Sequence, residues 1–356
     1  MIERKKTRRI YIGNVAIGDG APISVQSMTN TKTTDTENTV AQINALQAAG
    51  CDIVRLAVPD MEAARNLGNI IKKVSVPLVA DIHFDYRLAL EAINQGISAL
   101  RLNPGNIGSE DRVKAVVREA KANNIPIRIG VNAGSLDKAL LEKYGGITAE
   151  ALVESAIRHV RILEQQDFYD MKISLKAHDV PLTLEAYQLM SERVDYPLHL
   201  GITEAGTART GMIKSAVGIG ALLTQGIGDT FRISLTGDPV VEVKVANEIL
   251  KSLGLREYGP TLISCPTCGR TCIDLLGIAA QVEERLADVK KPISVAVMGC
   301  VVNGPGEARG ADVGIAGGNG VGLVFRRGEI IRKVDEKNLV EELFKEIDSI
   351  VNEEEK

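Results

Sequence analysis

The first 250 residues repeat one unit, in which a short apolar strand ends in polar residues and a helical segment follows. Eight such strands are predicted, over residues 23–26, 53–58, 78–82, 99–103, 127–131, 171–175, 198–202 and 230–235. The intervening segments space their apolar residues at helical intervals. Apolar strands that alternate with helices indicate a parallel sheet covered by those helices. Eight units over about 230 residues predict an α/β fold, a closed (β/α)8 TIM-type barrel.

An open doubly wound sheet is the alternative α/β fold. The glycine fingerprint G-x-G-x-x-G, typical of such sheets, does not follow the first predicted strand. We therefore expect the barrel, in which reactive side chains gather at the carboxyl ends of the strands.

Basic residues occupy the carboxyl ends of five predicted strands. They are Arg55, Arg101, Arg128, Lys176 and Arg232. Charges are rarely buried in a strand unless they line a pocket, because an unpaired buried ion is costly. In a barrel these five side chains would converge on one mouth, where guanidinium groups suit a phosphate or diphosphate. For any single one of them, a salt bridge across the barrel is the alternative.

Two acids and two histidines lie at the same strand ends. Asp81 and Glu204 are expected either to pair with the bases or to transfer protons. His83 and His199 are each as consistent with orienting a loop as with touching a substrate.

A second domain follows a Gly/Pro-containing linker near residues 254–260, which gives predicted domains of 1–253 and 260–356. Its predicted strands cover residues 262–264, 293–298, 313–316, 322–326 and 329–334. Helices are predicted over 274–287 and 338–351. This pattern predicts a small α+β module.

Four of the five cysteines lie in this module. Cys265 and Cys268 form a CxxC turn, and Cys300 follows in a Gly/Pro-rich loop. Structural zinc sites use such ligands but usually close with a fourth Cys or His, and every histidine lies upstream. An iron–sulfur cluster tolerates a weaker fourth ligand, for which Glu307 is the available carboxylate. Spacing favours iron–sulfur over zinc, and a disulfide is least favoured. Cys272 could close an all-cysteine site.

The remaining cysteines are better explained by packing. Cys51 opens a barrel strand, and we expect it, and with less support Cys272, to pack as a small apolar residue.

The overall charge of −4 predicts neither a nucleic-acid surface nor a membrane-binding one. Residues 1–9 are basic, but no apolar segment or cleavage site follows, so a solvated tail is expected. No apolar run reaches transmembrane length. We expect a cytoplasmic, reducing compartment, where clustered cysteines indicate metal binding or catalysis.

Several long strings in the chain closely resemble the 4-hydroxy-3-methylbut-2-enyl diphosphate synthase family. They span residues 100–106, 130–135, 200–206, 265–270 and 298–308. The resemblance covers essentially the whole chain and is closest to the two-domain bacterial type. It implies a [4Fe–4S] cluster held by Cys265, Cys268, Cys300 and Glu307. It also implies the substrate 2-C-methyl-D-erythritol 2,4-cyclodiphosphate, opened by a two-electron reductive dehydration in the non-mevalonate isoprenoid pathway.

The same resemblance implies flavodoxin or ferredoxin as electron donor and a homodimer in which one chain's cluster module caps the other's barrel. Within this scheme the substrate-binding residues are Arg55, Arg101, Arg128, Asn132, Lys176, Thr203, Arg232 and Ser234. The catalytic candidates are Glu204, for proton delivery to the leaving hydroxyl, and Glu307, as an exchangeable ligand. A charge partner for Arg232 or Lys176 is the other interpretation of Glu204.

Two other functions fit parts of the pattern. One is a pterin-binding type of barrel transferase with a zinc-stapled tail, which needs no redox chemistry. The other is a non-catalytic iron–sulfur carrier, in which a basic barrel mouth would have no purpose. The colour of anaerobically purified protein separates the first from a reductase, and turnover of the cyclodiphosphate separates the second.

Overall fold

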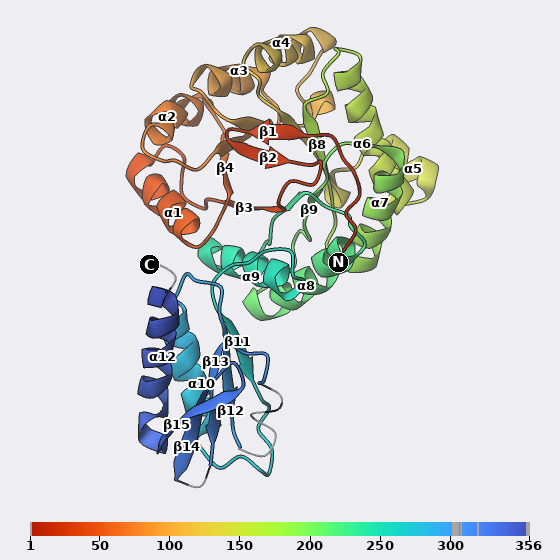
Figure 1. Cartoon of the computed structure of the whole chain (residues 1–356). Coiled ribbons are helices and arrows are strands. Elements are labelled where there is room, and N and C mark those ends of the chain that lie inside the picture. The colour runs from red at the N-terminus through yellow and green to blue at the C-terminus, as the bar shows by residue number, and fades with distance from the viewer. Residues whose placement is uncertain (1, 301–305, 307, 319, 354–356) are drawn as a thin grey trace. The chain divides into compact units, whose positions relative to one another are not determined.

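The computed structural model describes residues 2–300, 306, 308–318 and 320–353. They divide into two compact units, Met1–Arg256 and Glu257–Lys356. Helices surround the strands of the first unit, and the second unit carries helices against a smaller sheet (Figure 1). Among the described residues, no helix is long and apolar enough to cross a membrane.

The first unit is a parallel barrel. Its strands are β3 (Ser24–Met28), β4 (Ile53–Ala57), β5 (Leu78–Asp81), β6 (Ala99–Arg101), β7 (Ile127–Asn132), β8 (Met171–Lys176), β9 (His199–Leu200) and β10 (Thr230–Phe231). They pair in the order β8-β7-β6-β5-β4-β3-β10-β9. A parallel bridge between Ile173 and Leu198 brings the two end strands together. The predicted barrel is confirmed, with strand ends that differ from the predicted ones by at most four residues.

Helices separate the strands. They are α1 (Thr36–Ala48), α2 (Met61–Ile71), α3 (Tyr86–Asn94), α4 (Glu110–Ala122), α5 (Lys138–Tyr144), α6 (Ala149–Glu164), α7 (Val180–Arg193), α8 (Ala208–Thr224) and α9 (Pro239–Ser252). Short 3-10 turns at Pro104–Asn106 and Ala133–Ser135 follow β6 and β7. An aspartate whose side chain accepts a backbone N–H starts several of these helices. These caps are Asp35, Asp60, Asp85, Asp137, Asp179 and Asp238.

An antiparallel hairpin of β1 (Ile10–Ile12) and β2 (Val15–Ile17) precedes the barrel. Its isoleucines pack on Ile53, Val79 and Ala99, which begin or lie near the start of three barrel strands. The hairpin therefore covers the amino ends of these strands and leaves the carboxyl ends as the mouth.

The expected solvated tail at residues 1–9 is wrong for the described part of that segment. Thr7 is buried and donates a hydrogen bond to Asp229, which also forms an ion pair with Arg4 at 3.0 Å. The basic residues misled the prediction because their partner lies more than 200 positions away in sequence.

The second unit contains a five-stranded mixed sheet. Its order is β11 (Thr261–Ser264), β12 (Ser294–Met298), β13 (Val313–Gly317), β14 (Val321–Arg326) and β15 (Glu329–Asp335). The first three strands are parallel, and the last two pairings are antiparallel. Helices α10 (Leu275–Leu286) and α12 (Leu339–Glu353) supply Val282, Leu343 and Ile347 to its core. The predicted α+β elements are confirmed.

Candidate functional site

Basic side chains from several strands share the interior of the barrel near its mouth. Strand register places Arg101 beside Arg128, and Arg128 beside Lys172. Four residues further along, Asn132 lies beside Lys176. Side chains at every second position of a strand point to the same side. Lys172, Ser174 and Lys176 therefore line the interior together, and all three are buried.

Asp81 is the carboxylate at the centre of this basic group. It lies 3.3 Å from Arg101 Nη1, 3.7 Å from Arg55 Nε and 3.6 Å from His83 Nε2. Burial by itself raises the pKa of Asp81, but the charge of Arg55, the His83 ring 3.6 Å away and the charge of Arg101 lower it below its usual range. Asp81 is therefore ionised, and the salt-bridge alternative holds for Arg55 and Arg101.

Arg128 and Lys176 form no ion pair with any described residue. Arg128 is 2% exposed and donates only to Ser174 Oγ at 3.3 Å, so its Nε and Nη2 are left without partners in the described structure. Burial lowers the pKa of Lys176, and the charges of Arg128, Arg55, Arg232 and Arg101 lower it further. This mutual influence places the five predicted bases close to one another. An unpaired buried cation costs several kcal/mol, which an anion would offset.

Arg232 pairs with Glu242 and not with Glu204, the partner that one interpretation of the sequence gave it. Its guanidinium lies 3.3 Å from Glu242 Oε2, and Glu242 also accepts the Leu235 backbone N–H at 3.0 Å. Arg232 and Arg55 both donate to the sulfur of Met28, at 3.4 and 3.0 Å. A thioether is a weak acceptor, so these guanidinium groups retain capacity for an anion.

Two glycines make room for the long basic side chains. A Cβ on Gly130 would lie 2.7 Å from Arg101 Nε, and one on Gly201 would lie 3.1 Å from Lys176 Nζ. A side chain at Gly130 would force Arg101 to shift, and one at Gly201 would crowd Lys176 and the Arg232 carbonyl oxygen, 3.0 Å away.

The other predicted contacts lie around the same mouth. Asn132 ends β7, Thr203 follows β9 and donates its backbone N–H to Ala177 at 3.2 Å, and Ser234 follows β10; all three are partly buried. Glu204 is exposed and has a left-handed backbone with φ of 52°. No ion pair joins it to a described residue, which leaves its carboxylate available at the rim. Strained backbone of this kind is common at functional sites.

Two further residues position the loop after β6. Asn103 bonds to both backbone groups of Gly130, at 2.9 and 2.8 Å. His159 of α6 accepts the Gly105 N–H through Nδ1 at 3.2 Å. Burial lowers the pKa of His159 to about 4, so its ring is neutral near pH 7. His199, which is fully buried and bonded to Thr230 Oγ1 at 2.6 Å, lines the interior of the barrel.

The His159 contact predicts a pH-dependent stability. The pKa of His159 is about 4 in the folded state, whereas its ordinary value is 6.5. Between pH 6.5 and pH 4, His159 therefore gains a proton in the unfolded chain but not in the folded one. Stability is therefore lost as the pH falls from 6.5 toward 4. When the pH is lowered from 7.5 to 5, the unfolding free energy of the parent chain should fall, and that of His159→Gln should fall by about 1–2 kcal/mol less. Denaturant titration measures both values. Equal losses in the two proteins would contradict this role.

The cysteine loops lie at the ends of neighbouring parallel strands in the second unit. Ser264 is in register with Val297, so Cys265 directly follows β11 and Cys300 lies two residues after β12. The Gly299 N–H donates to Cys265 Sγ at 3.2 Å. A backbone hydrogen bond at Arg270 lowers the pKa of the exposed Cys268 thiol. These features favour thiolates that bind a metal or cluster.

The expected fourth ligand, Glu307, lies outside the described residues. Among the residues that are described, no three His, Cys, Asp or Glu side chains are grouped closely enough to hold a metal ion. The donor set nevertheless fits an iron–sulfur cluster, because thiols on two adjacent loops offer sulfur ligands from one side of the sheet. All four histidines belong to the barrel unit, so none is available within this module to complete a zinc site.

Cys51 is buried as predicted, and burial raises the pKa of its thiol to about 12. The packed position expected for Cys272 is wrong: it is exposed, and its Sγ lies 3.2 Å from the Arg270 carbonyl oxygen. Its loop is short and polar, so no apolar surface covers it.

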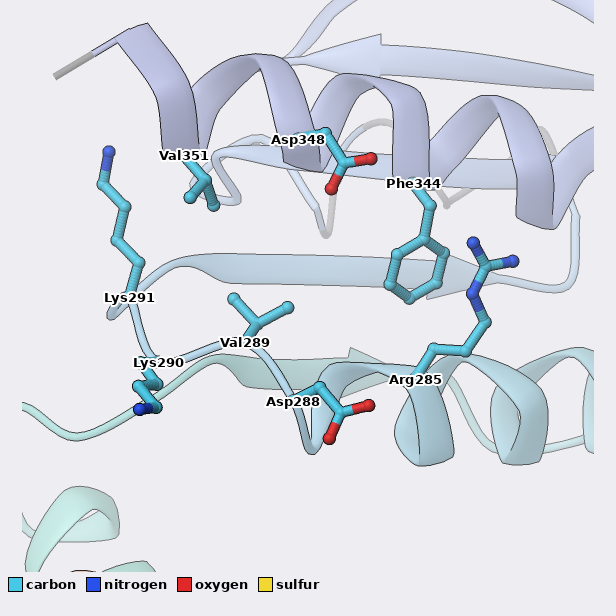
Figure 2. A pocket seen from close by; sticks show the side chains of 8 residues that line it. All are labelled: Arg285, Asp288, Val289, Lys290, Lys291, Phe344, Asp348 and Val351. Atoms are coloured by element: carbon cyan, nitrogen blue, oxygen red, sulfur yellow. The ribbon is translucent and has the colours of Figure 1, made fainter. Parts of the chain in front are cut away.

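A hollow of about 710 Å³ lies elsewhere in the second unit (Figure 2). It is lined by Arg285, Asp288, Val289, Lys290, Lys291, Phe344, Asp348 and Val351. Residues 288–291 precede β12, whereas Cys300 follows it, so the hollow lies at the opposite end of that strand from the cysteines.

Fold and site together define a class: a (β/α)8 barrel with a basic, anion-binding interior, joined to a small module that presents thiols at parallel strand ends. The model described as "GcpE TIM-barrel domain" matches residues 7–247, and that described as "GcpE protein C-terminal domain" matches residues 261–349. The chain belongs to the GcpE family.

Its relatives match over their full lengths. A Clostridium perfringens protein is 62% identical over 98% of this chain and 100% of its own, and one from Maridesulfovibrio salexigens is 62% identical over 99% of both. A Geobacter sulfurreducens protein is 61% identical, over 98% of this chain and 99% of its own. Each is named 4-hydroxy-3-methylbut-2-en-1-yl diphosphate synthase (flavodoxin). The family resemblance expected from the sequence is confirmed.

Among solved structures, dihydropteroate synthase from Stenotrophomonas maltophilia aligns with a TM-score of 0.52 at 13% identity. The alignment covers 70% of this chain and 97% of that one, and it shows the fold alone. The closely related sequences carry a different name, so they do not favour the transferase alternative.

Proposed function

We propose that this chain reductively opens the ring of 2-C-methyl-D-erythritol 2,4-cyclodiphosphate and releases 4-hydroxy-3-methylbut-2-enyl diphosphate. The observation that carries the proposal is the excess of buried cations in the barrel: Arg128 and Lys176 have no acidic partner among the described residues. A cyclic diphosphate supplies the missing negative charge. The names of relatives about 60% identical support the same reaction.

In this proposal the barrel, residues 1–253, holds the substrate. Arg55, Arg101, Arg128 and Lys176 bind the diphosphate, with Asn132, Thr203, Arg232 and Ser234 around it. Asp81 keeps Arg55 and Arg101 in place, and Glu242 does the same for Arg232. Fixing the diphosphate orients the ring carbons of the substrate, so that their reaction with the reducing group becomes effectively unimolecular. Glu204, exposed at the rim, delivers a proton to the leaving hydroxyl.

The module of residues 260–356 holds a [4Fe–4S] cluster through Cys265, Cys268, Cys300 and Glu307. When bound, such a cluster supplies two electrons one at a time together with a Lewis-acidic iron. The names of the relatives point to flavodoxin as donor, and ferredoxin is the alternative. The proposal includes a cytoplasmic homodimer in which the site is shared between chains.

The test is anaerobic turnover of the cyclodiphosphate with reduced flavodoxin or a chemical reductant. We expect stoichiometric formation of the allylic diphosphate, detected by phosphorus NMR, and a brown protein that contains iron. A colourless zinc protein, or an iron protein that leaves the cyclodiphosphate unchanged, would contradict the proposal.

A further inference from the structure

Lys172 of β8 is a buried basic residue that the proposed reaction does not use. It is 2% exposed and lies on the inward face of β8, two residues below Ser174 and four below Lys176. Its Nζ has no hydrogen-bond partner in the described structure. A lysine held in this way is a buried titratable group in the interior of the barrel.

The groups that face Lys172 are mostly positive. Arg128 lies beside it on β7, Arg55 contributes from β4 and His199 from β9, and Lys176 shares its strand. Burial lowers the pKa of Lys172 well below its usual range, and the charges of Arg128 and Arg55 lower it further.

The acids of the interior are already engaged. Asp81 on β5 pairs with Arg55 and with Arg101 of β6. Asp229, just before β10, is the acid that favours a charged Lys172, but it is bonded to Arg4, Thr7 and the Leu198 backbone. Glu242 is paired with Arg232.

Burial without a hydrogen-bond partner, beside Arg128, disfavours the charged form of the Lys172 amine while the barrel holds no anion. A bound diphosphate reverses the balance, because opposite charge nearby favours the protonated amine. We propose that Lys172 takes up one proton as the diphosphate binds, so that the substrate enters the barrel together with a proton. The inference rests on the proposed function for the identity of the anion.

The proton balance is simple. The conjugate acid of the buffer gives one proton to Lys172 Nζ, the ammonium forms, and no other covalent bond changes. Linkage then requires the Kd for the diphosphate to rise about tenfold for each pH unit over the range in which the proton is taken up. Lys172 acts as a positioning residue, because its new charge holds the anion and Arg128 in one arrangement.

The test is calorimetric titration of the anaerobically purified full-length protein with the cyclodiphosphate, near pH 8, in buffers of different ionisation enthalpy. The dependence of the observed heat on that enthalpy counts the protons exchanged. We expect uptake of about one proton per site. Lys172→Met should bind about 10–100-fold more weakly, without proton uptake and with a Kd that barely changes with pH. Lys121→Met, on the outer helix α4, is the matched control and should behave like the parent.

A parent protein whose binding heat is independent of the buffer would overturn the inference without requiring any variant. Persistent uptake in Lys172→Met would also overturn it, since Lys176 or another group would then carry the proton. Failure to bind the cyclodiphosphate would instead count against the proposed function. In that case inorganic pyrophosphate is the second probe, and because pyrophosphate itself titrates in this pH range, its proton count is compared between the parent and Lys172→Met. An excess uptake of about one proton by the parent would still support Lys172, whereas no binding or an equal count in the two proteins would reject it.

Discussion

Cys268→Ser should purify without its brown colour, with less than about a tenth of the parent iron and with no measurable reductive turnover. Cys268 lies in the turn after β11, and the loop after β12 presents Cys300 from the adjacent parallel strand. A serine hydroxyl is a far poorer ligand for iron than a thiolate, so the cluster would lose one of its few sulfur ligands. Iron analysis and the visible spectrum of anaerobically prepared protein measure the effect.

Cys272→Ser and Cys51→Ser are the matched controls. Cys272 is exposed four residues beyond Cys268, and Cys51 is buried in the barrel unit. Both variants should retain iron and activity close to the parent. Full iron content in Cys268→Ser would refute the ligand assignment. Loss of iron in Cys272→Ser would instead indicate an all-cysteine site in which Glu307 takes no part.

Arg128→Met should lower kcat/KM for the cyclodiphosphate by about 100–1000-fold, the scale of a lost charge-assisted anchor in a buried site. The same change should leave folding stability equal or higher. Arg128 is fully buried, no carboxylate pairs with it among the described residues, and burial together with Arg55 and Arg101 lowers its pKa. Replacing an unpaired buried cation with an apolar side chain of similar length removes a desolvation cost.

Steady-state kinetics and thermal melting of the same preparations separate the two effects. Arg65→Met, an exposed arginine on α2, is the control and should match the parent in both measurements. A structural role for Arg128 would give the opposite pair of results: a lower melting temperature with kcat/KM nearly unchanged.

The barrel could be predicted because its strands are short apolar runs separated by helical spacing, a pattern that needs no knowledge of distant contacts. The hairpin of β1 and β2 was not predicted. Its strands have three residues each, and their apolar partners Ile53, Val79 and Ala99 come from later parts of the chain. Pairings across long sequence distances cannot be inferred from local pattern.

In the candidate site, too, some features follow from local sequence pattern and others depend on contacts between distant parts of the chain. Arg101, Lys176 and Arg232 converge because they lie at or just after the carboxyl ends of their strands. The strand-end position predicted for Arg128 is wrong, because it is the second residue of β7 and lies in register with Lys172. Lys172 was overlooked because it lies near the start of β8, although alternation places it on the same face as Ser174 and Lys176. The Arg232–Glu242 pair depends on how α9 packs against the barrel, which spacing alone does not determine.

The hairpin and the segment before it also determine at which end of the barrel a ligand can bind. Residues 4–17 seal the amino end through Asp229 and the apolar contacts of Ile10, Ile12 and Ile17. The amino end of the barrel is thus covered, so a ligand bound at the carboxyl ends of the strands enters and leaves at that end. Product that lingers there would block the next molecule, so release competes directly with loading, and an unreactive diphosphate lodged in the opening would stop both.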